Sequence, residues 1–93
     1  MAERIRLSQW DAVVEELRQF GAPGEVRTGD GRIRLDFGSA HVEVSRDGTV
    51  STGMPLHSFE REGAVDLVVD HEAGTLTVEG ADIQYTFRRP GTP

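Results

Sequence analysis

Apolar residues recur with two different periods along the chain, and these periods separate a helical part from a β-rich part. Between Leu7 and Gly21 the apolar residues are three or four positions apart, which places them on one face of an α-helix: Trp10, Val13, Val14, Leu17 and Phe20. Ser8 suits the N-cap, Gly21 suits the C′ position, and Pro23 prevents continuation. The pattern predicts one helix at about residues 9–20.

The rest of the chain alternates apolar and polar residues with a period of two, which is typical of strands covered on one side. This alternation predicts strands at about residues 25–28, 32–37, 40–45, 49–52, 64–70, 75–79 and 82–88. We therefore expect a single α+β domain over residues 1–93. Its one N-terminal helix packs on one face of an antiparallel meander sheet of about six strands, and the tail 89–93 is disordered.

Short turns set the expected registers, because residues directly opposite each other must lie on the same face of a sheet. Gly38, Gly48 and Gly74 stand where the turns need a left-handed residue, and Asp30-Gly31 forms a further turn. The expected pairs are Val26–Leu35, Ile33–Val44, Leu35–Val42, Arg34–Glu43, Asp36–His41, Val44–Val50, Val69–Leu76 and Val78–Ile83.

The charge balance narrows the classes of function. Sixteen Asp and Glu residues oppose ten basic residues, all of them Arg, and the net charge is −6. This excess of carboxylate argues against a general affinity for nucleic acid or for anionic membranes. The chain has no cysteine, no hydrophobic segment of a signal peptide and no apolar run long enough to span a bilayer. We expect a cytoplasmic protein.

Residues 30–50, "DGRIRLDFGSAHVEVSRDGTV", contain two hairpin turns in close succession. This stretch resembles the strand-rich segments of small haloarchaeal proteins, and it is similar to the end of the halobacterial output domain, which has a comparable hairpin and an Asp-Gly-Thr-Val turn. The order of elements after Val50 departs from that domain. The resemblance therefore implies a small, uncharacterised acidic family of haloarchaeal type, and no function or residue role is carried over.

Asp70, His71 and Glu72 are adjacent and belong to the residue types that bind metals or exchange protons. Pairing Val69 with Leu76 makes residues 71–74 a four-residue loop. Asp70 can then accept hydrogen bonds from the N–H groups of its own turn, as in an Asx-turn. His71 and Glu72 are expected to point into water, so we interpret the trio as a hairpin turn.

The same register reasoning places three other carboxylates together. Pairing Val78 with Ile83 puts Glu79 between Asp66 and Asp82 on the solvent face. Three neighbouring carboxylates are ligands for a hard cation such as Ca²⁺, Mg²⁺ or Na⁺. The alternative is a hydrated acidic patch. No motif in the chain implies a cofactor.

The segment "STGMPLHSFEREG", residues 51–63, breaks the alternation, and Pro55 would block a ladder bond. Three interpretations remain open. Met54, Leu56 and Phe59 complete the core, or they form the contact of a homodimer, or the segment lines a ligand pocket with His57 as its polar group.

The chain has no nucleophile elbow, no Gly-rich phosphate loop and no HExxH motif, so an enzymatic role is not favoured. The leading hypothesis is a small non-enzymatic interaction module, homodimeric, that acts through residues 52–60 or a free strand edge. The alternative is an enzyme or a small-ligand or cation-binding protein that uses His57 or the Asp66/Glu79/Asp82 patch. A third hypothesis, nucleic-acid contact through Arg27, Arg32 and Arg34, is opposed by the acidic charge balance.

Overall fold

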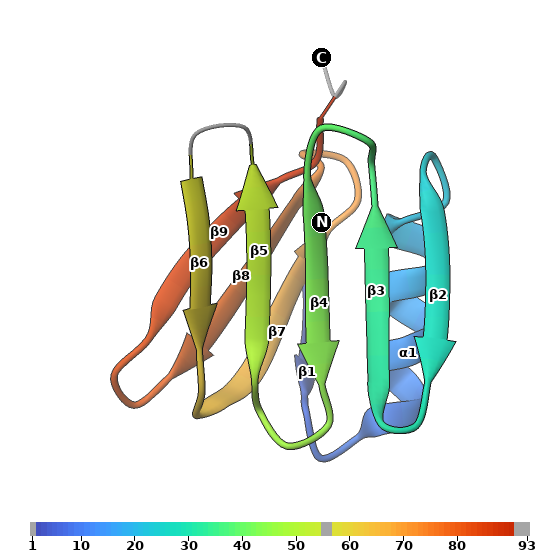
Figure 1. Ribbon diagram of the computed structural model, residues 1–93. Helices are drawn as coiled ribbons and strands as arrows, with labels where there is room; N and C mark the ends of the chain where they lie inside the picture. Colours follow the sequence, from blue (N-terminus) through green and yellow to red (C-terminus); the bar gives the residue numbers. More distant parts are fainter. Residues whose placement is uncertain (1, 55–56, 91–93) are drawn as a thin grey trace.

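A computed structural model describes residues 2–54 and 57–90, and for residues 54 and 57–59 it describes the backbone alone. Figure 1 shows how the helix and the strands are arranged. In chain order the elements are β1 (Ala2–Arg6), α1 (Trp10–Phe20), β2 (Glu25–Gly29), β3 (Arg32–Asp36), β4 (His41–Ser45), β5 (Val50–Met54), β6 (His57–Arg61), β7 (Ala64–Asp70), β8 (Thr75–Gly80) and β9 (Gln84–Arg88).

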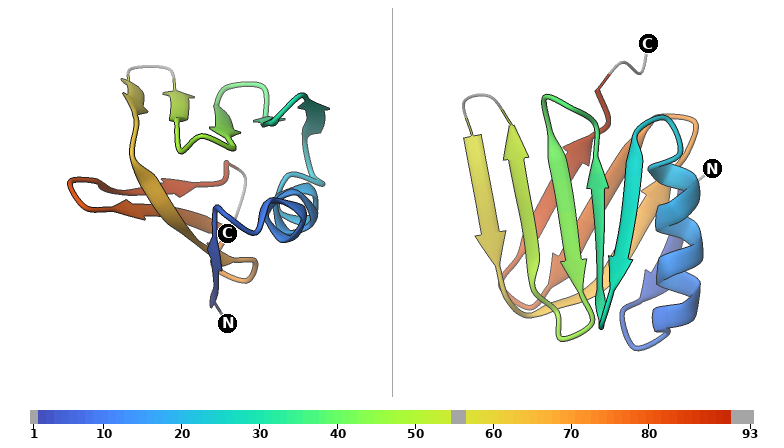
Figure 2. Two further views of the ribbon diagram at one scale, coloured as in Figure 1. Left: turned by 90° about the horizontal axis from the view of Figure 1, so that it is seen from below. Right: turned by 45° about the vertical axis from the view of Figure 1, so that its right-hand side comes forward.

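The strands form two antiparallel sheets that face each other. One has the order β2-β3-β4-β5-β6 and the other the order β1-β7-β8-β9. Figure 2 shows the two layers edge-on, with α1 lying along one side of them, near β2. The α+β class is confirmed, but the single meander sheet is wrong. A period of two shows that one face of a strand is buried, and it does not show whether a helix or a second sheet covers that face.

The core fills the space between the sheets and α1. The five-stranded sheet contributes Ile33, Leu35, Val42, Val44 and Val50, and the four-stranded sheet contributes Ile5, Leu67, Val69, Leu76, Val78 and Phe87. The helix adds Val13, Leu17 and Phe20 from the predicted stripe. All of these side chains are buried, whereas Trp10 and Val14 are only half-buried against the cluster. The helix therefore closes one side of a sandwich and does not cover a whole sheet.

The ends of α1 differ from the expected caps. Gln9, not Ser8, is the N-cap, and its side chain makes no capping hydrogen bond. The chain is instead held by a turn, in which the Gln9 N–H donates to the Arg6 carbonyl at 2.9 Å. Gly21 caps the C-terminus of the helix with φ −88°, so it does not adopt the left-handed conformation expected of a C′ glycine. A Cβ there would lie 2.7 Å from Leu35 Cδ2, so glycine permits the helix end to approach β3 closely.

Two strands were not expected from the sequence. β1 pairs with β7, and its one buried residue, Ile5, lies opposite Leu67. β6 pairs with β5 within the segment that breaks the alternation. The sequences of these two strands carry several charges and almost no periodic signal, and only pairing with a neighbour identifies them. Pro55 lies outside the described residues, between the two strands.

Most of the expected registers are confirmed. The structure pairs Val26 with Leu35, Ile33 with Val44, Leu35 with Val42, Arg34 with Glu43, Asp36 with His41, Val44 with Val50 and Val69 with Leu76. The turn glycines Gly31, Gly38, Gly48 and Gly74 all have positive φ. These turns are local, so the chain between the strands leaves little choice of register.

The register of the last hairpin is wrong by two residues. Val78 lies opposite Tyr85, and Glu79 lies opposite Gln84. The turn residues are Ala81 and Asp82, since the Gly80 N–H donates to the Ile83 carbonyl at 2.9 Å. A shift of two keeps every side chain on its face, so the alternation of apolar and polar residues is blind to it.

Gly24 provides a test of close packing between the helix-to-sheet connection and β3. A Cβ at Gly24 would overlap the Asp36 carbonyl oxygen and lie 2.9 Å from Phe37 Cδ1. We expect Gly24→Ala to lower the free energy of unfolding by about 1–3 kcal/mol, because a backbone atom has to move. Gly29→Ala is the control, since nothing lies within 4 Å of its Cβ position. Urea unfolding measures both variants, and equal effects would contradict this account.

Candidate functional site

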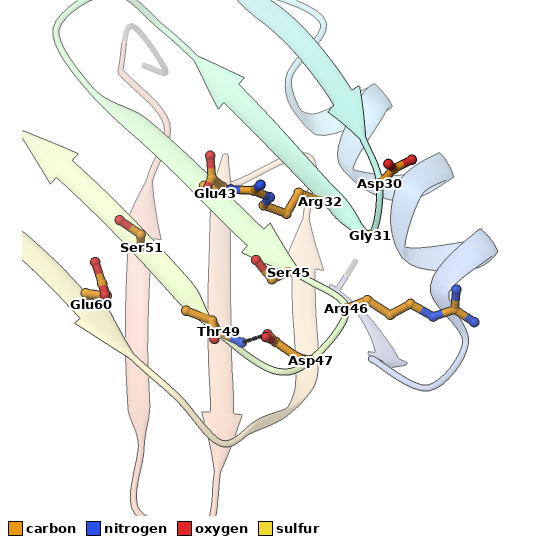
Figure 3. Close-up of a pocket in the computed structure, with 10 residues that line it drawn as sticks. All are labelled: Asp30, Gly31, Arg32, Glu43, Ser45, Arg46, Asp47, Thr49, Ser51 and Glu60. Atoms are coloured by element: carbon orange, nitrogen blue, oxygen red, sulfur yellow. Dashed lines mark hydrogen bonds and ion pairs between the residues drawn. The ribbon is translucent and has the colours of Figure 1, made fainter.

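The outer face of the five-stranded sheet carries an open polar hollow of about 590 Å³. Figure 3 shows it over β3, β4, β5 and β6, close to the turns after β2 and β4. The hollow exists because short side chains stand between long ones. Ser45 and Ser51 form part of its floor, whereas Arg32, Glu43 and Glu60 form its walls. The register places Glu43, Ser51 and Glu60 in one row across three strands.

The charged groups of the hollow are only loosely paired. Glu43 lies 4.0 Å from Arg32 Nη1 and 3.9 Å from Arg34 Nη1, distances too long for hydrogen bonds. All three side chains are partly exposed to water, at 67% for Arg32, 40% for Arg34 and 29% for Glu43. Such ion pairs contribute little to stability, so these groups can be displaced by a polar solute or by a partner surface.

Two further residues at the rim of the hollow, Arg46 and Asp47, belong to the turn after β4. The Asp47 carboxylate accepts a hydrogen bond from the Thr49 N–H at 3.0 Å. That bond holds the pKa of Asp47 below its usual value. Arg46 extends from the same turn toward α1 and away from the floor of the hollow, and it also lines a smaller depression with Trp10. Both residues shape the rim without completing a reactive group.

The described hydroxyl groups of the hollow do not form a nucleophile–base pair. Among the described residues, no hydrogen bond joins the hydroxyl of Ser45, Thr49 or Ser51 to a histidine or a carboxylate side chain. A nucleophile needs such a base within hydrogen-bond reach. The hollow is also broad and open, so it excludes little water. Its chemistry suits weak polar contacts with another molecule.

The predicted acidic trio is replaced by a different arrangement. Asp66 and Glu79 do lie opposite each other, as expected. Arg4, on the unexpected strand β1, donates hydrogen bonds to Glu79 Oε1 at 2.6 Å and to Asp66 Oδ2 at 3.2 Å. The bond and the charge of Glu79 raise the pKa of Arg4 still further, with a smaller contribution from Asp66. Asp82 lies in the turn between β8 and β9, and not opposite Glu79.

The three carboxylates of the cation hypothesis are therefore not aligned: Asp66 lies opposite Glu79, but Asp82 does not. Among the side chains that the structure describes, which exclude those of residues 54–59, no group of three or more carboxylates or histidines is placed to hold a metal ion. One oxygen, Asp66 Oδ1, is buried and has no hydrogen-bond partner in the described structure. The positive charge that Asp66 and Glu79 face in the structure is the guanidinium of Arg4.

The Asp70-His71-Glu72 stretch is a hairpin turn, as expected. The Asp70 carboxylate accepts hydrogen bonds from the N–H groups of Ala73 at 3.0 Å and Glu72 at 3.1 Å. The Ala73 bond is the larger cause of the lowered pKa of Asp70. His71, however, does not point into water. Its Nε2 lies 2.8 Å from Glu16 Oε2 on α1, in a partly buried contact.

The prediction that His71 points into water was wrong, because it was based on the hairpin register alone and did not include the helix that packs against the turn. The helix packs against the turn, and Phe20 lies near the His71 ring with centroids 6.4 Å apart. Arg89 joins the same contact from the C-terminal side. It donates to the Phe20 carbonyl at 2.9 Å and lies 5.0 Å over the Phe20 ring. These residues tie the helix end to the four-stranded sheet, which is a structural role.

The other predicted site residues do not converge. His41 lies on the outer face of β4 opposite Gly53, where a Cβ would collide with the imidazole ring. Leu56 lies outside the described residues, and the backbones of Met54, His57 and Phe59 form part of β5 and β6. The side chains of these three residues are not described either, so the interface and pocket assignments stay predictions.

The arginines of the nucleic-acid hypothesis are close together but balanced by acids. Arg27 and Arg34 lie directly opposite each other on β2 and β3, with Arg32 at the end of β3. Arg27 pairs with Glu25 at 3.0 Å, and Glu43 lies between the other two. The patch therefore has no large excess of positive charge.

Sequence reasoning missed the hollow itself. Its one detectable signal was the confirmed register, which sets the short Ser51 of β5 beside the long Glu43 of β4 on the outward face, two positions from the short Ser45. The wall at Glu60 was hidden, because β6 was not recognised as a strand.

The Arg4 contact can be tested by removing its charge. We expect Arg4→Gln to lower the free energy of unfolding at neutral pH and low salt, because Asp66 and Glu79 then face each other without a cation. Salt should shrink the loss by screening. Arg61→Gln is the control, since Arg61 is an exposed arginine of the other sheet, opposite Val50, and the described structure shows no contact between it and these carboxylates. A double variant, Arg4→Gln with Asp66→Asn, should recover stability, and failure to do so would refute the repulsion.

The lowered pKa of Asp70 predicts a pH dependence. A carboxyl whose pKa is lower in the folded state stabilises the fold above its unfolded pKa of about 4, and this contribution is lost as the pH falls through the folded value. Chemical unfolding from pH 7 to pH 2 should therefore show Asp70→Ala destabilised at neutral pH, with the difference from wild type shrinking below about pH 4. Asp82→Ala in the next hairpin turn is the control. A difference independent of pH would contradict the interpretation.

Comparisons of the chain with protein-family models, with curated proteins and with solved structures found no match. Within the described residues, no helix has the length and apolar character needed to cross a membrane. The features of this chain that bear on function are an open polar hollow, loosely paired charges and sheets with exposed edges.

Proposed function

We propose that this protein is a small non-enzymatic interaction module that self-associates through an unpaired edge of one of its sheets. The observation that carries the proposal is the presence of open sheet edges. The five-stranded sheet ends in β2 and β6, and the four-stranded sheet ends in β1 and β9. Each of these strands pairs on one side only within the described structure. The N–H and C=O groups on the other side are a template for another strand.

The position of the helix limits which edges are open. α1 lies along the side of the sandwich near β2, and its contacts include β1, β3 and β7. On the opposite side, where β6 and β9 end their sheets, no helix is present in the described part of the chain. That side offers backbone groups to a partner without a steric obstacle from the helix.

The surface chemistry supports binding more than catalysis. The hollow on the outer face of the five-stranded sheet is open and polar, and its charged groups are loosely paired. Enzyme sites need pre-organised groups that exclude water, and this hollow offers neither. The predicted interface residues Met54 and Phe59 belong to β5 and β6 by their backbones, and the role of Met54, Leu56 and Phe59 in a contact stays a prediction.

Self-association is measurable by sedimentation velocity and light scattering over about two orders of magnitude in concentration. We expect a reversible dimer that becomes stronger in molar salt, because two chains of net charge −6 repel each other at low ionic strength. The protein should remain folded throughout, as circular dichroism would confirm. A strict monomer at millimolar concentration and molar salt would overturn the proposal.

A further inference from the structure

We infer that the partner is a second copy of this chain, paired antiparallel along the free edge of β9 with the two Thr86 residues facing each other on the two-fold axis. This inference rests on the proposed function and specifies its contact.

The hairpin between β8 and β9 determines which backbone groups face outward. The Gly80 N–H donates to the Ile83 carbonyl, so this pair is hydrogen-bonded. Hydrogen-bonded and non-hydrogen-bonded pairs alternate along an antiparallel ladder. Tyr85 and Phe87 therefore direct their N–H and C=O groups toward β8.

The alternate residues Gln84, Thr86 and Arg88 direct the same groups toward the free edge. A side-chain contact supports this assignment. The hydroxyls of Thr77 and Thr86 are 3.0 Å apart, as expected for a non-hydrogen-bonded pair, in which opposing side chains are closest. The free edge of β9 thus presents backbone donors and acceptors at every second residue.

Each of the other edge strands carries more charged residues than β9 does. β1 carries Glu3, Arg4 and Arg6 among its five residues. β2 carries Glu25 and Arg27 and ends in a glycine, and β6 ends in Glu60-Arg61. Charged residues on an edge strand oppose the addition of another strand.

β9 reads Gln-Tyr-Thr-Phe-Arg, with one charge at its end. Its central Tyr85, Thr86 and Phe87 are residue types with high strand propensity. Ile83 and Tyr85 are half-buried, and the end of the hairpin to which they belong projects beyond β6 in Figure 1. What this edge offers to another strand is the outward backbone groups of Gln84, Thr86 and Arg88, with little charge beside them.

A two-fold axis at Thr86 creates compatible pairs on both faces. Gln84 then lies opposite Arg88 of the second copy on the outer face, and Tyr85 lies opposite Phe87 of the second copy on the inner face. No like charges meet, and every outward N–H faces a carbonyl. The two four-stranded sheets become one continuous sheet across the axis.

The neighbouring registers are poorer. An axis at Phe87 places Gln84 opposite Pro90, which has no N–H to donate. An axis at Tyr85 places Arg88 opposite Asp82, which lies in the turn before β9, so the paired stretch is shorter. An axis at Arg88 brings two arginines directly opposite each other. The Thr86 register is therefore the one that this edge favours.

Disulfide trapping tests the register directly, because the chain contains no cysteine. A single introduced thiol can cross-link only to another copy. In a glutathione redox buffer at molar salt, we expect Thr86→Cys to form a covalent dimer, since opposite Cα atoms about 5.5 Å apart suit a disulfide. Gln84→Cys alone should not, because its two copies would be roughly 13 Å apart. A mixture of Gln84→Cys and Arg88→Cys should give the mixed dimer.

A second pair of variants separates strand addition from folding. Thr86→Pro removes an outward N–H and leaves the bonds to β8 intact, so it should weaken dimerisation about tenfold or more. Thr86→Val loses the Thr77 hydroxyl contact but keeps the N–H, and its dimer affinity should stay within about threefold of wild type. Circular dichroism and the unfolding midpoint establish that both variants are folded.

The outcomes distinguish the two proposals. A wild-type monomer at molar salt overturns the interaction module and this inference together. A wild-type dimer with no Thr86→Cys cross-link, and with unchanged affinity in folded Thr86→Pro, overturns the β9 pairing while the module stands on another edge. A cross-link at Thr86→Cys together with one at Gln84→Cys alone shows non-specific collision and also overturns the register. Selective trapping at Thr86 and between residues 84 and 88 supports it.

Discussion

The fold depends on the burial of two apolar sheet faces against each other. Ile33, Leu35, Val42 and Val44 on one sheet and Leu67, Val69, Leu76 and Val78 on the other are all fully buried. Neither sheet could stay in water alone, because each would expose a continuous apolar surface. The remaining elements complete this sandwich: α1 closes one side with Val13, Leu17 and Phe20, and Arg89 holds the helix end by bonding to the Phe20 carbonyl.

The surface follows from the same constraint. Apolar residues are used on the inner faces, so the outer faces carry charged and hydroxyl residues, and the hollow forms where serines on adjacent strands stand between longer side chains. Some charges on the outer faces are paired within their sheet, as for Arg4 with Asp66 and Glu79. The backbone N–H and C=O groups at the sheet edges have no partner strand within the sandwich, since an open sheet always leaves one side of its last strand unpaired. Interaction through an edge is therefore consistent with the architecture, whereas catalysis would require an enclosed group of reactive residues.

Sequence reasoning succeeded where the physical cause is local. The helix stripe, the registers around Leu35 and Val44, and the Asp70 turn depend on residues a few positions apart, and the structure confirms them. It failed where a distant segment decides. Arg4 is 62 positions from Asp66 and 75 from Glu79, so no spacing rule places it there. The contact of His71 with Glu16 spans 55 positions and was missed for the same reason. The predicted register of the last hairpin was wrong by two residues, because a shift of two keeps every side chain on its own face of the sheet.

The sequence by itself determined the α+β class, the helix, the inward and outward face of most strands, and the turns with left-handed glycines, because periodicity and φ preference act within a few residues. The tertiary structure decided that the strands divide into two facing sheets, that β1 and β6 are strands, and that an arginine occupies the place of the supposed cation. It also decided which edges remain open. These features depend on which surfaces meet, and alternation in a single strand records only that a face is covered, not what covers it.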